Sequence, residues 1–201
     1  MANLQPLPAP GLAIAPQYIT SNVLKIILKG QALSKTLTAT TAEGIPLFTI
    51  TGETFSSSHR RTVIDTSSNT TLFQIRKDGM GTKHYYAEVA ENGPRLFTVD
   101  SKSSWTHRQR TAVRFANQAD MRRSEESLEY IPVGFRDDGS FTWNGQLVVV
   151  VEKRFSLLTE YHLTIAPGLD PALVVGVMVA MVDQEKTRSS KSNASVVAAT
   201  C

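Results

Sequence analysis

The residues of this sequence best suited to chemistry are basic, and they gather in short segments. The segment from Lys102 to Arg123 holds six lysines and arginines but only one acid, Asp120. If "HRQRTAVRFAN" is a β-strand, then Arg108, Arg110 and Arg114 project from one face, because successive side chains of a strand alternate in direction. This pattern predicts a row of guanidinium groups on the surface of a sheet.

Two further basic groups flank turns. His59, Arg60 and Arg61 form one corner, and Arg76, Lys77 and Lys83 lie on either side of a predicted hairpin turn. Arginine forks bind phosphate oxygens in pairs, so these nine residues are candidates for binding the anionic headgroups of a membrane. The same pattern is also typical of the ordinary solvated face of a barrel, and this second interpretation is favoured.

The motifs of enzymes are missing from the sequence. The four histidines include no pair at metal-binding spacing, and neither a nucleophile elbow nor a phosphate-binding P-loop occurs. We therefore predict no catalytic residue, no metal site and no cofactor, and expect that the protein is not an enzyme.

Composition sets limits on compartment and partners. The formal net charge is +3, a mildly basic value that permits contact with phosphates, but no nucleic-acid motif accompanies it and nucleic-acid binding is disfavoured. The only cysteine is Cys201, so no disulfide can form within the chain. We expect a cytoplasmic protein that associates with membranes, if at all, at their periphery.

The chain divides into three predicted parts. Residues 1–16 carry four prolines and are expected to form an extended arm. Residues 187–201 are rich in serine and alanine and are expected to be a disordered tail. Residues 17–186 are predicted to form a single folded domain.

Within that domain, most segments alternate between apolar and polar residues. The segments "NVLKIILKG", "TTLFQIRKDG" and "KHYYAEVAENG" show this period of two, which is typical of half-buried strands. Pairs such as Asp78-Gly79 and Asn144-Gly145 supply the positive φ angles of tight hairpins. Short strands joined by such turns predict an antiparallel sheet in a sandwich or a barrel.

The run from Pro171 to Val182 contains no polar side chain. As a helix it would be about 18 Å long, too short for a bilayer core of about 30 Å, so no transmembrane span is expected. Its valines and Gly176 favour a strand, whereas Asp170 as N-cap and Pro171 as first helical residue favour a helix. A helix that is apolar on every side must be buried on every side, and a wide barrel of hairpins could enclose it.

Three segments resemble the LURP-one-related family, which is part of the tubby C-terminal-like superfamily together with the phospholipid scramblases. The first, "YHLTIAPGLDPALVVGVMVAMVDQ", resembles the C-terminal motif of the family, with Gly168, Asp170 and Pro171 in the turn that leads into the hydrophobic helix. The others are "LFTITGETFSSSHRRTVIDTSSNTTLFQIRKD" and "GQLVVVVEKRFSLLTEYHLTIAPG". Together they span most of residues 45–185.

The resemblance implies a mainly β fold, a closed antiparallel barrel of about twelve strands enclosing one hydrophobic C-terminal helix. It also implies a non-enzymatic binding module, with phosphoinositides or an anionic membrane surface as ligand, because tubby proteins bind phosphoinositides. The alternative that it implies is a scaffold or regulatory protein that binds a protein partner in stress or defence responses.

Overall fold

The fold was analysed in a computed structural model. The structure describes residues 4–30, 36–52, 60–79, 84–101, 110–133, 138–155 and 159–198, with side chains of the final helix through Gln184. In these residues, a single turn of 3-10 helix, η1 (Pro16–Tyr18), is followed by twelve strands and one long helix. The strands are β1 (Leu24–Gly30), β2 (Leu37–Thr41), β3 (Pro46–Gly52), β4 (Arg61–Asp65), β5 (Thr70–Lys77), β6 (His84–Glu88), β7 (Arg95–Ser101), β8 (Thr111–Ala116), β9 (Glu125–Val133), β10 (Asp138–Trp143), β11 (Gln146–Phe155) and β12 (Thr159–Ile165).

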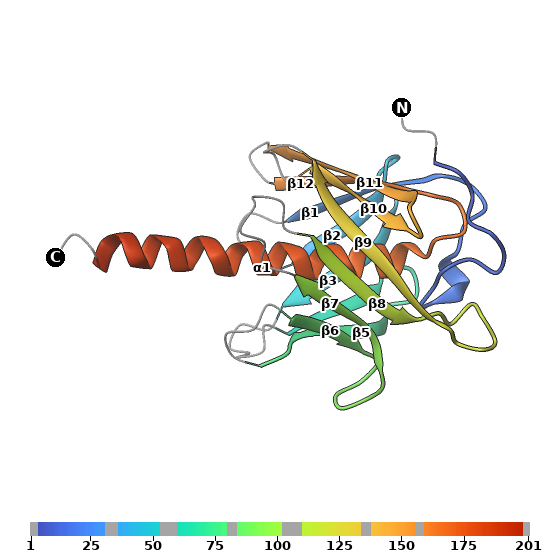
Figure 1. Ribbon diagram of the computed structural model, residues 1–201, viewed down its shortest axis with the longest axis horizontal. Helices are drawn as coiled ribbons and strands as arrows, with labels where there is room; N and C mark the ends of the chain where they lie inside the picture. The colour runs from blue at the N-terminus through green and yellow to red at the C-terminus, as the bar shows by residue number, and fades with distance from the viewer. Residues whose placement is uncertain are drawn as a thin grey trace.

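The strands form a closed antiparallel barrel. Each strand pairs with its neighbours in sequence, and β1 closes the sheet by pairing with β12, Leu24 opposite Ile165. An even number of up-and-down strands allows the first and last to meet antiparallel. Figure 1 shows the barrel wall surrounding helix α1 (Pro171–Ala198). The predicted fold class is confirmed.

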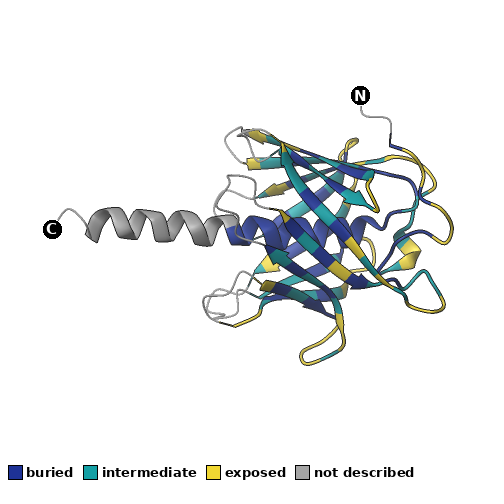
Figure 2. Cartoon of the chain, viewed as in Figure 1, coloured by how far each residue is buried: buried dark blue, intermediate teal, exposed yellow. Residues whose placement is uncertain are grey.

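The alternation seen in the sequence decides which side of each strand faces inward. In β7, for example, Phe97 and Val99 are buried, and their neighbours along the strand are only partly covered. Inside the barrel, every residue of α1 from Pro171 to Gln184 is buried, as the dark blue core of Figure 2 shows. The apolar run is therefore a helix, and its lack of a polar face is explained by a sheet on all sides.

Helix α1 packs closely against the wall at Gly176. A Cβ atom at this position would lie 3.0 Å from the rings of Phe73 and Phe97. These two rings meet edge to face, with centroids 5.9 Å apart. Glycine therefore allows the helix to approach an aromatic pair that a larger residue would displace.

Helix α1 continues to Ala198, so its last residues overlap the segment 187–201, for which a disordered tail was predicted. Once a helix is nucleated, each further residue adds one hydrogen bond at little cost, and the buried part of α1 supplies that nucleus.

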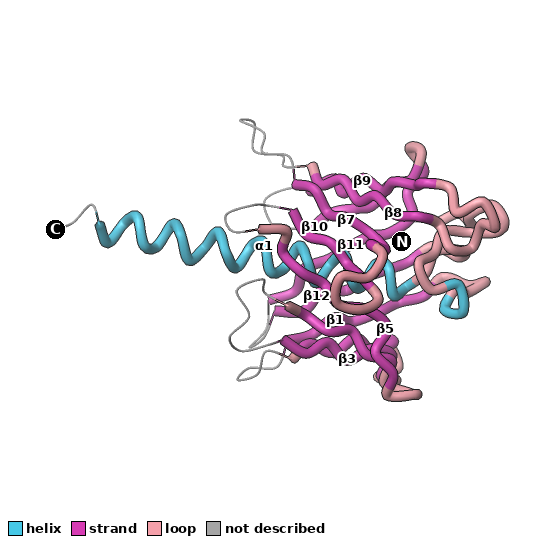
Figure 3. Tube along the Cα trace, turned by 90° about the horizontal axis from the view of Figure 1, so that it is seen from below, coloured by secondary structure: helices cyan, strands magenta, loops and turns pink. Residues whose placement is uncertain are grey.

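The N-terminal arm differs from its predicted place outside the folded domain. Residues Leu7, Leu12 and Ile14 are buried and belong to the core. Leu12 forms a parallel bridge with Leu169, just ahead of α1. The arm lies across the end of the barrel at which α1 begins (Figure 3), and its apolar residues are buried there. We call this the arm-covered end, and the opposite end, through which α1 leaves the barrel, the exit end.

Candidate functional site

The arm-covered end is held together by the carboxylate of Asp170, which is fully buried. Asp170 Oδ2 accepts hydrogen bonds from the backbone N–H groups of Ile14 at 3.1 Å and Ala15 at 2.8 Å, and Oδ1 accepts from Ala172 N–H at 2.7 Å. Burial raises the pKa of Asp170 to about 6, and the backbone N–H groups act in the opposite direction. One side chain thus caps α1 and holds the arm.

Gly168 and Pro171 complete this junction. Gly168 has a φ of +87°, and its carbonyl accepts a hydrogen bond from Leu12 N–H at 2.9 Å. Pro171 is the first residue of α1, where a missing N–H costs no hydrogen bond. These residues therefore shape the turn that receives the arm.

The loop between β8 and β9, residues 117–124, is bound to the arm. The buried side chain of Asn117 accepts from Ala13 N–H at 3.0 Å and donates to the Gly11 carbonyl at 2.8 Å. Gln118 N–H adds a hydrogen bond of 2.7 Å to the Ala13 carbonyl. Arm and loop form one unit.

A second contact fixes the arm at η1. The hydroxyl of Tyr18 donates to Asp65, whose carboxylate also accepts from Ser67 N–H at 2.7 Å. Hydrogen bonds from Ser67 and Tyr18 hold the pKa of Asp65 well below its usual range. Burial and the Asp65 carboxylate raise the pKa of Tyr18 to about 12.

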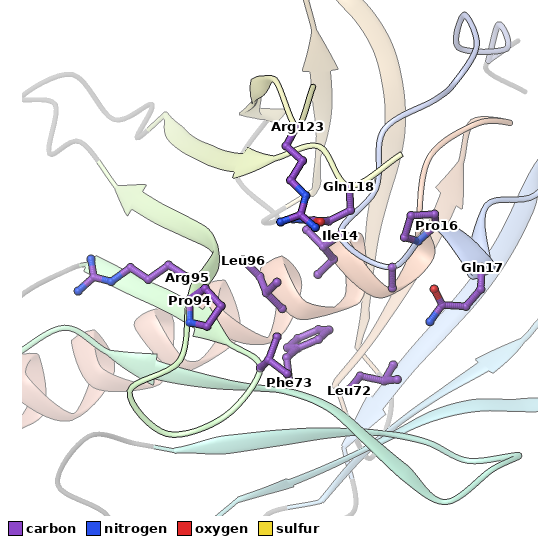
Figure 4. Close-up of a pocket in the computed structure, with 12 residues that line it drawn as sticks. Ile14, Pro16, Gln17, Leu72, Phe73, Pro94, Arg95, Leu96, Gln118 and Arg123 are labelled. Carbon is purple, nitrogen blue, oxygen red and sulfur yellow. The ribbon is translucent and has the colours of Figure 1, made fainter. Parts of the chain in front are cut away.

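Between the arm, β5, β7 and loop 117–124 lies a cavity of about 490 Å³, which we call the arm-end cavity. Its apolar side chains include Ile14, Phe73 and Leu96, which point into the space in Figure 4. Its polar side chains include Gln118 and Arg123, and none of the described residues that line it is a carboxylate. The volume falls within the range of about 300–1,000 Å³ typical of small-molecule sites.

Next to this cavity, the tip of loop 117–124 exposes an apolar side chain beside two cations. Met121 is 101% exposed, the highest value among the large hydrophobic residues that the structure describes as exposed. Arg122 and Arg123 follow it and are both exposed. This combination is typical of a segment that meets a lipid interface.

A second hollow, of about 480 Å³, lies on the outer wall over β1, β11 and β12. Its lining includes Glu152, which forms an ion pair with Arg154 at 3.3 Å. The cations of this hollow thus face a carboxylate of their own wall, which makes the arm-end cavity the better candidate for an anion.

Among the predicted basic residues that the structure describes, Arg60 and Arg76 share the partner Glu91, and Arg61, Arg110 and Arg114 pair with other carboxylates. His59, Lys83 and Arg108 lie outside the described residues. Arg61 begins β4 at the exit end and forms a two-pronged ion pair with Asp183 of α1, with Nε–Oδ2 and Nη2–Oδ1 both at 2.8 Å. Asp183 raises the pKa of Arg61. The Arg61 side chain is 11% exposed, and its ion pair with Asp183 holds α1 in the barrel.

Arg60 and Arg76 also have acidic neighbours. Arg76 is 10% exposed and pairs with Glu88 at 2.8 Å and with Glu91 at 3.2 Å; Glu91 also accepts from Arg60 at 3.1 Å. Lys77 is partly exposed at the end of β5.

Arg110, directly before β8, and Arg114, within it, are both exposed, and the alternation of the strand directs Arg114 to the outer face. Arg110 pairs with Glu129 at 3.1 Å and Arg114 with Asp100 at 2.8 Å. A headgroup at this face would compete with these carboxylates.

The candidate site at the arm-covered end was not predicted from the sequence. Arg122 and Arg123 belong to the basic segment Lys102–Arg123, but the strand expected there favoured positions 108–114. The signal available was Met121 beside two arginines, between Asp120 and Ser124, which are both typical turn residues.

No group of three or more histidine, cysteine, aspartate or glutamate residues that could hold a metal occurs in the part of the chain that the structure covers. Of the helices described, none is both long and apolar enough to cross a membrane.

A closed antiparallel barrel around a buried C-terminal helix defines the class of fold. A search of the solved structures finds the same fold in an X-ray structure of a protein from Arabidopsis thaliana, with a TM-score of 0.53 and 16% sequence identity, covering 88% of this chain and 99% of that one. The profile of the LURP-one-related family matches residues 23–183, and the chain belongs to this family. The resemblance noted in the sequence is thereby confirmed. A search of the curated proteins gives no match.

Proposed function

We propose that the protein is a non-enzymatic binding module that docks at the periphery of anionic membranes, and that it does so through its arm-covered end. The observation that carries this proposal is the tip of loop 117–124, where a fully exposed Met121 stands beside Arg122 and Arg123. Phosphoinositides are the anionic lipids that the likeness to tubby proteins suggests.

The energetics favour a weak, reversible association. Burial of a methionine side chain contributes about 1.5–3 kcal/mol, and each basic residue close to an anionic surface adds about 1 kcal/mol. The sum for Met121 and the two arginines, about 3.5–5 kcal/mol, is enough for peripheral binding that salt can reverse. Cations elsewhere on the wall contribute less, because Arg110 and Arg114 already have carboxylate partners.

Co-sedimentation with vesicles tests the proposal. We expect the protein to pellet with phosphatidylcholine vesicles that contain phosphatidylserine or phosphatidylinositol bisphosphate, but not with phosphatidylcholine alone, and to be released at high salt. Met121→Asp and the double variant Arg122→Glu/Arg123→Glu should each lose most of the bound fraction.

The matched control is Lys25→Glu/Lys29→Glu, which makes the same change in net charge on the wall at β1. It should lose little binding. Equal pelleting with neutral vesicles would contradict the proposal, and so would equal losses in the two double variants. A third double variant, Arg110→Glu/Arg114→Glu, measures how much the outer face of β8 contributes.

A further inference from the structure

We infer that the arm-end cavity is a binding site for an amphipathic organic anion, a small molecule with an apolar body and one carboxylate or phosphate group that Arg123 binds. This inference goes beyond membrane docking, because it concerns a single molecule inside the cavity.

The apolar part of the site is preformed. Phe73 is 1% exposed and its ring is held between Phe97 and Gly176 of α1. Ile14, on the opposite wall, is fixed by the hydrogen bond from its N–H to Asp170. Since both walls are rigid, a ligand would lose little free energy in ordering them.

The polar part of the site is the guanidinium of Arg123, whose neighbours in the cavity are the uncharged side chains of Gln118 and Ile14. In Figure 4 the guanidinium of Arg123 lies beside Gln118 and above Ile14, and Arg95 points away from the space. Arg95 stacks on Tyr86, with its guanidinium carbon 4.4 Å from the ring centroid. Among the described residues, no carboxylate forms an ion pair with Arg123, so an anion in the cavity has no competitor there.

The backbone of Arg123 supports a role for its side chain in binding. Its φ is +48°, in the left-handed region. The other described non-glycine residues with positive φ are Asn69, Asn92 and Asn144, and asparagine tolerates this conformation far better than arginine does. A structural role at this turn would be served better by asparagine or glycine. An arginine kept at a strained position beside a cavity points to a function for the guanidinium.

The ligand class follows from these contacts. Leu96 and Phe73 offer apolar surface, Gln118 offers an amide, and Arg123 offers a planar fork that matches a carboxylate or a phosphate. The same chemistry could come from a free organic acid in solution or from the headgroup of a lipid. Octyl phosphate in solution represents the first source, and vesicles represent the second.

Isothermal titration calorimetry with octyl phosphate, below its micelle concentration, tests the inference. The wild type should bind one molecule saturably, and should bind the neutral octanol at least about tenfold more weakly, because a charged hydrogen bond is lost. Arg123→Asn should weaken octyl phosphate binding about tenfold or more while keeping or raising the Tm, since it relieves the backbone. Lys25→Asn, which removes an exposed cation on β1, should change neither quantity.

Leu96→Trp separates the cavity from the membrane proposal. The larger ring should fill the space and abolish octyl phosphate binding, but leave Met121 and vesicle binding as in the wild type. Loss of vesicle binding in Met121→Asp with octyl phosphate binding intact would show the reverse separation. The inference is overturned if the wild type shows no saturable binding of octyl phosphate, or if binding survives both Arg123→Asn and Leu96→Trp.

Discussion

The two ends of the barrel are held together by different kinds of contact. At the arm-covered end, a buried carboxylate and a buried amide bind the backbone of a separate segment, with Asp170 and Asn117 together accepting from Ala13, Ile14 and Ala15. At the exit end, two charged side chains, Arg61 and Asp183, bind each other. The first arrangement builds a fixed surface from the arm and a loop, and the second only fastens a helix. This difference is consistent with the place of the cavity, of Arg123, which has no ion pair with another described residue, and of the exposed Met121, all at the arm-covered end.

The strongest test of this comparison is Asp170→Ala. It leaves three N–H groups without their acceptor and removes the cap of α1, and each buried N–H costs about 1–3 kcal/mol. We expect the free energy of unfolding to fall by about 4 kcal/mol in urea titrations at neutral pH. A loss below about 1 kcal/mol would mean that the arm contributes little to the fold.

The second prediction concerns pH and applies to the arm-covered end alone. Because the pKa of Asp170 is raised from 3.8 to about 6 in the folded state, the folded protein binds more protons than the unfolded chain between these values. The stabilising contribution of protonated Asp170 is therefore full below pH 4, and it is lost as the pH rises through 6. Relative to Asp170→Asn, the wild type should lose about 3 kcal/mol of unfolding free energy between pH 4 and pH 7.

Taking the difference from Asp170→Asn cancels the opposite effect of Asp65, whose lowered pKa favours the folded state at higher pH. A constant difference between the two proteins over this range would contradict the prediction.

The third prediction concerns the exit end, where the expected loss of unfolding free energy is smaller. Asp183→Ala should reduce the unfolding free energy by about 2 kcal/mol, because Arg61 is left buried without its partner. A double-mutant cycle with Arg61→Ala should give a coupling energy of about 1–2 kcal/mol. In this cycle, binding of octyl phosphate should stay at the wild-type level, since neither residue lines the arm-end cavity. A coupling near zero would show that the two-pronged ion pair does not hold α1.

The strands could be predicted from the sequence because their signal, the alternation of apolar and polar residues, is local. The run after Asp170 carries signals for both a strand and a helix, and the resemblance to the LURP-one-related family implied that it is a helix enclosed by a barrel. The place of the arm could not be predicted in the same way, because prolines interrupt its apolar residues and its acceptors, Asn117 and Asp170, lie far along the chain.

The candidate site was predicted less well, for a physical reason. The number of basic residues in a segment does not show which of them form ion pairs, because the acidic partner can lie far along the chain. Arg61, for example, pairs with Asp183 on α1, 122 positions away. Arg76 likewise finds Glu88 across the hairpin. What the sequence does show is the order Met121-Arg122-Arg123, whose importance depends on an exposure that only the structure reveals.

The central claim is that the arm-covered end meets the membrane. A fluorescent, environment-sensitive label at Met121→Cys, with Cys201→Ser to leave one thiol, measures this directly. The matched label is at Lys29→Cys, near the exit end and 47% exposed. On anionic vesicles, the label at position 121 should shift to the blue and be quenched by lipid-borne quenchers, and the label at position 29 should not change. A shift at position 29 with none at position 121 would contradict the account.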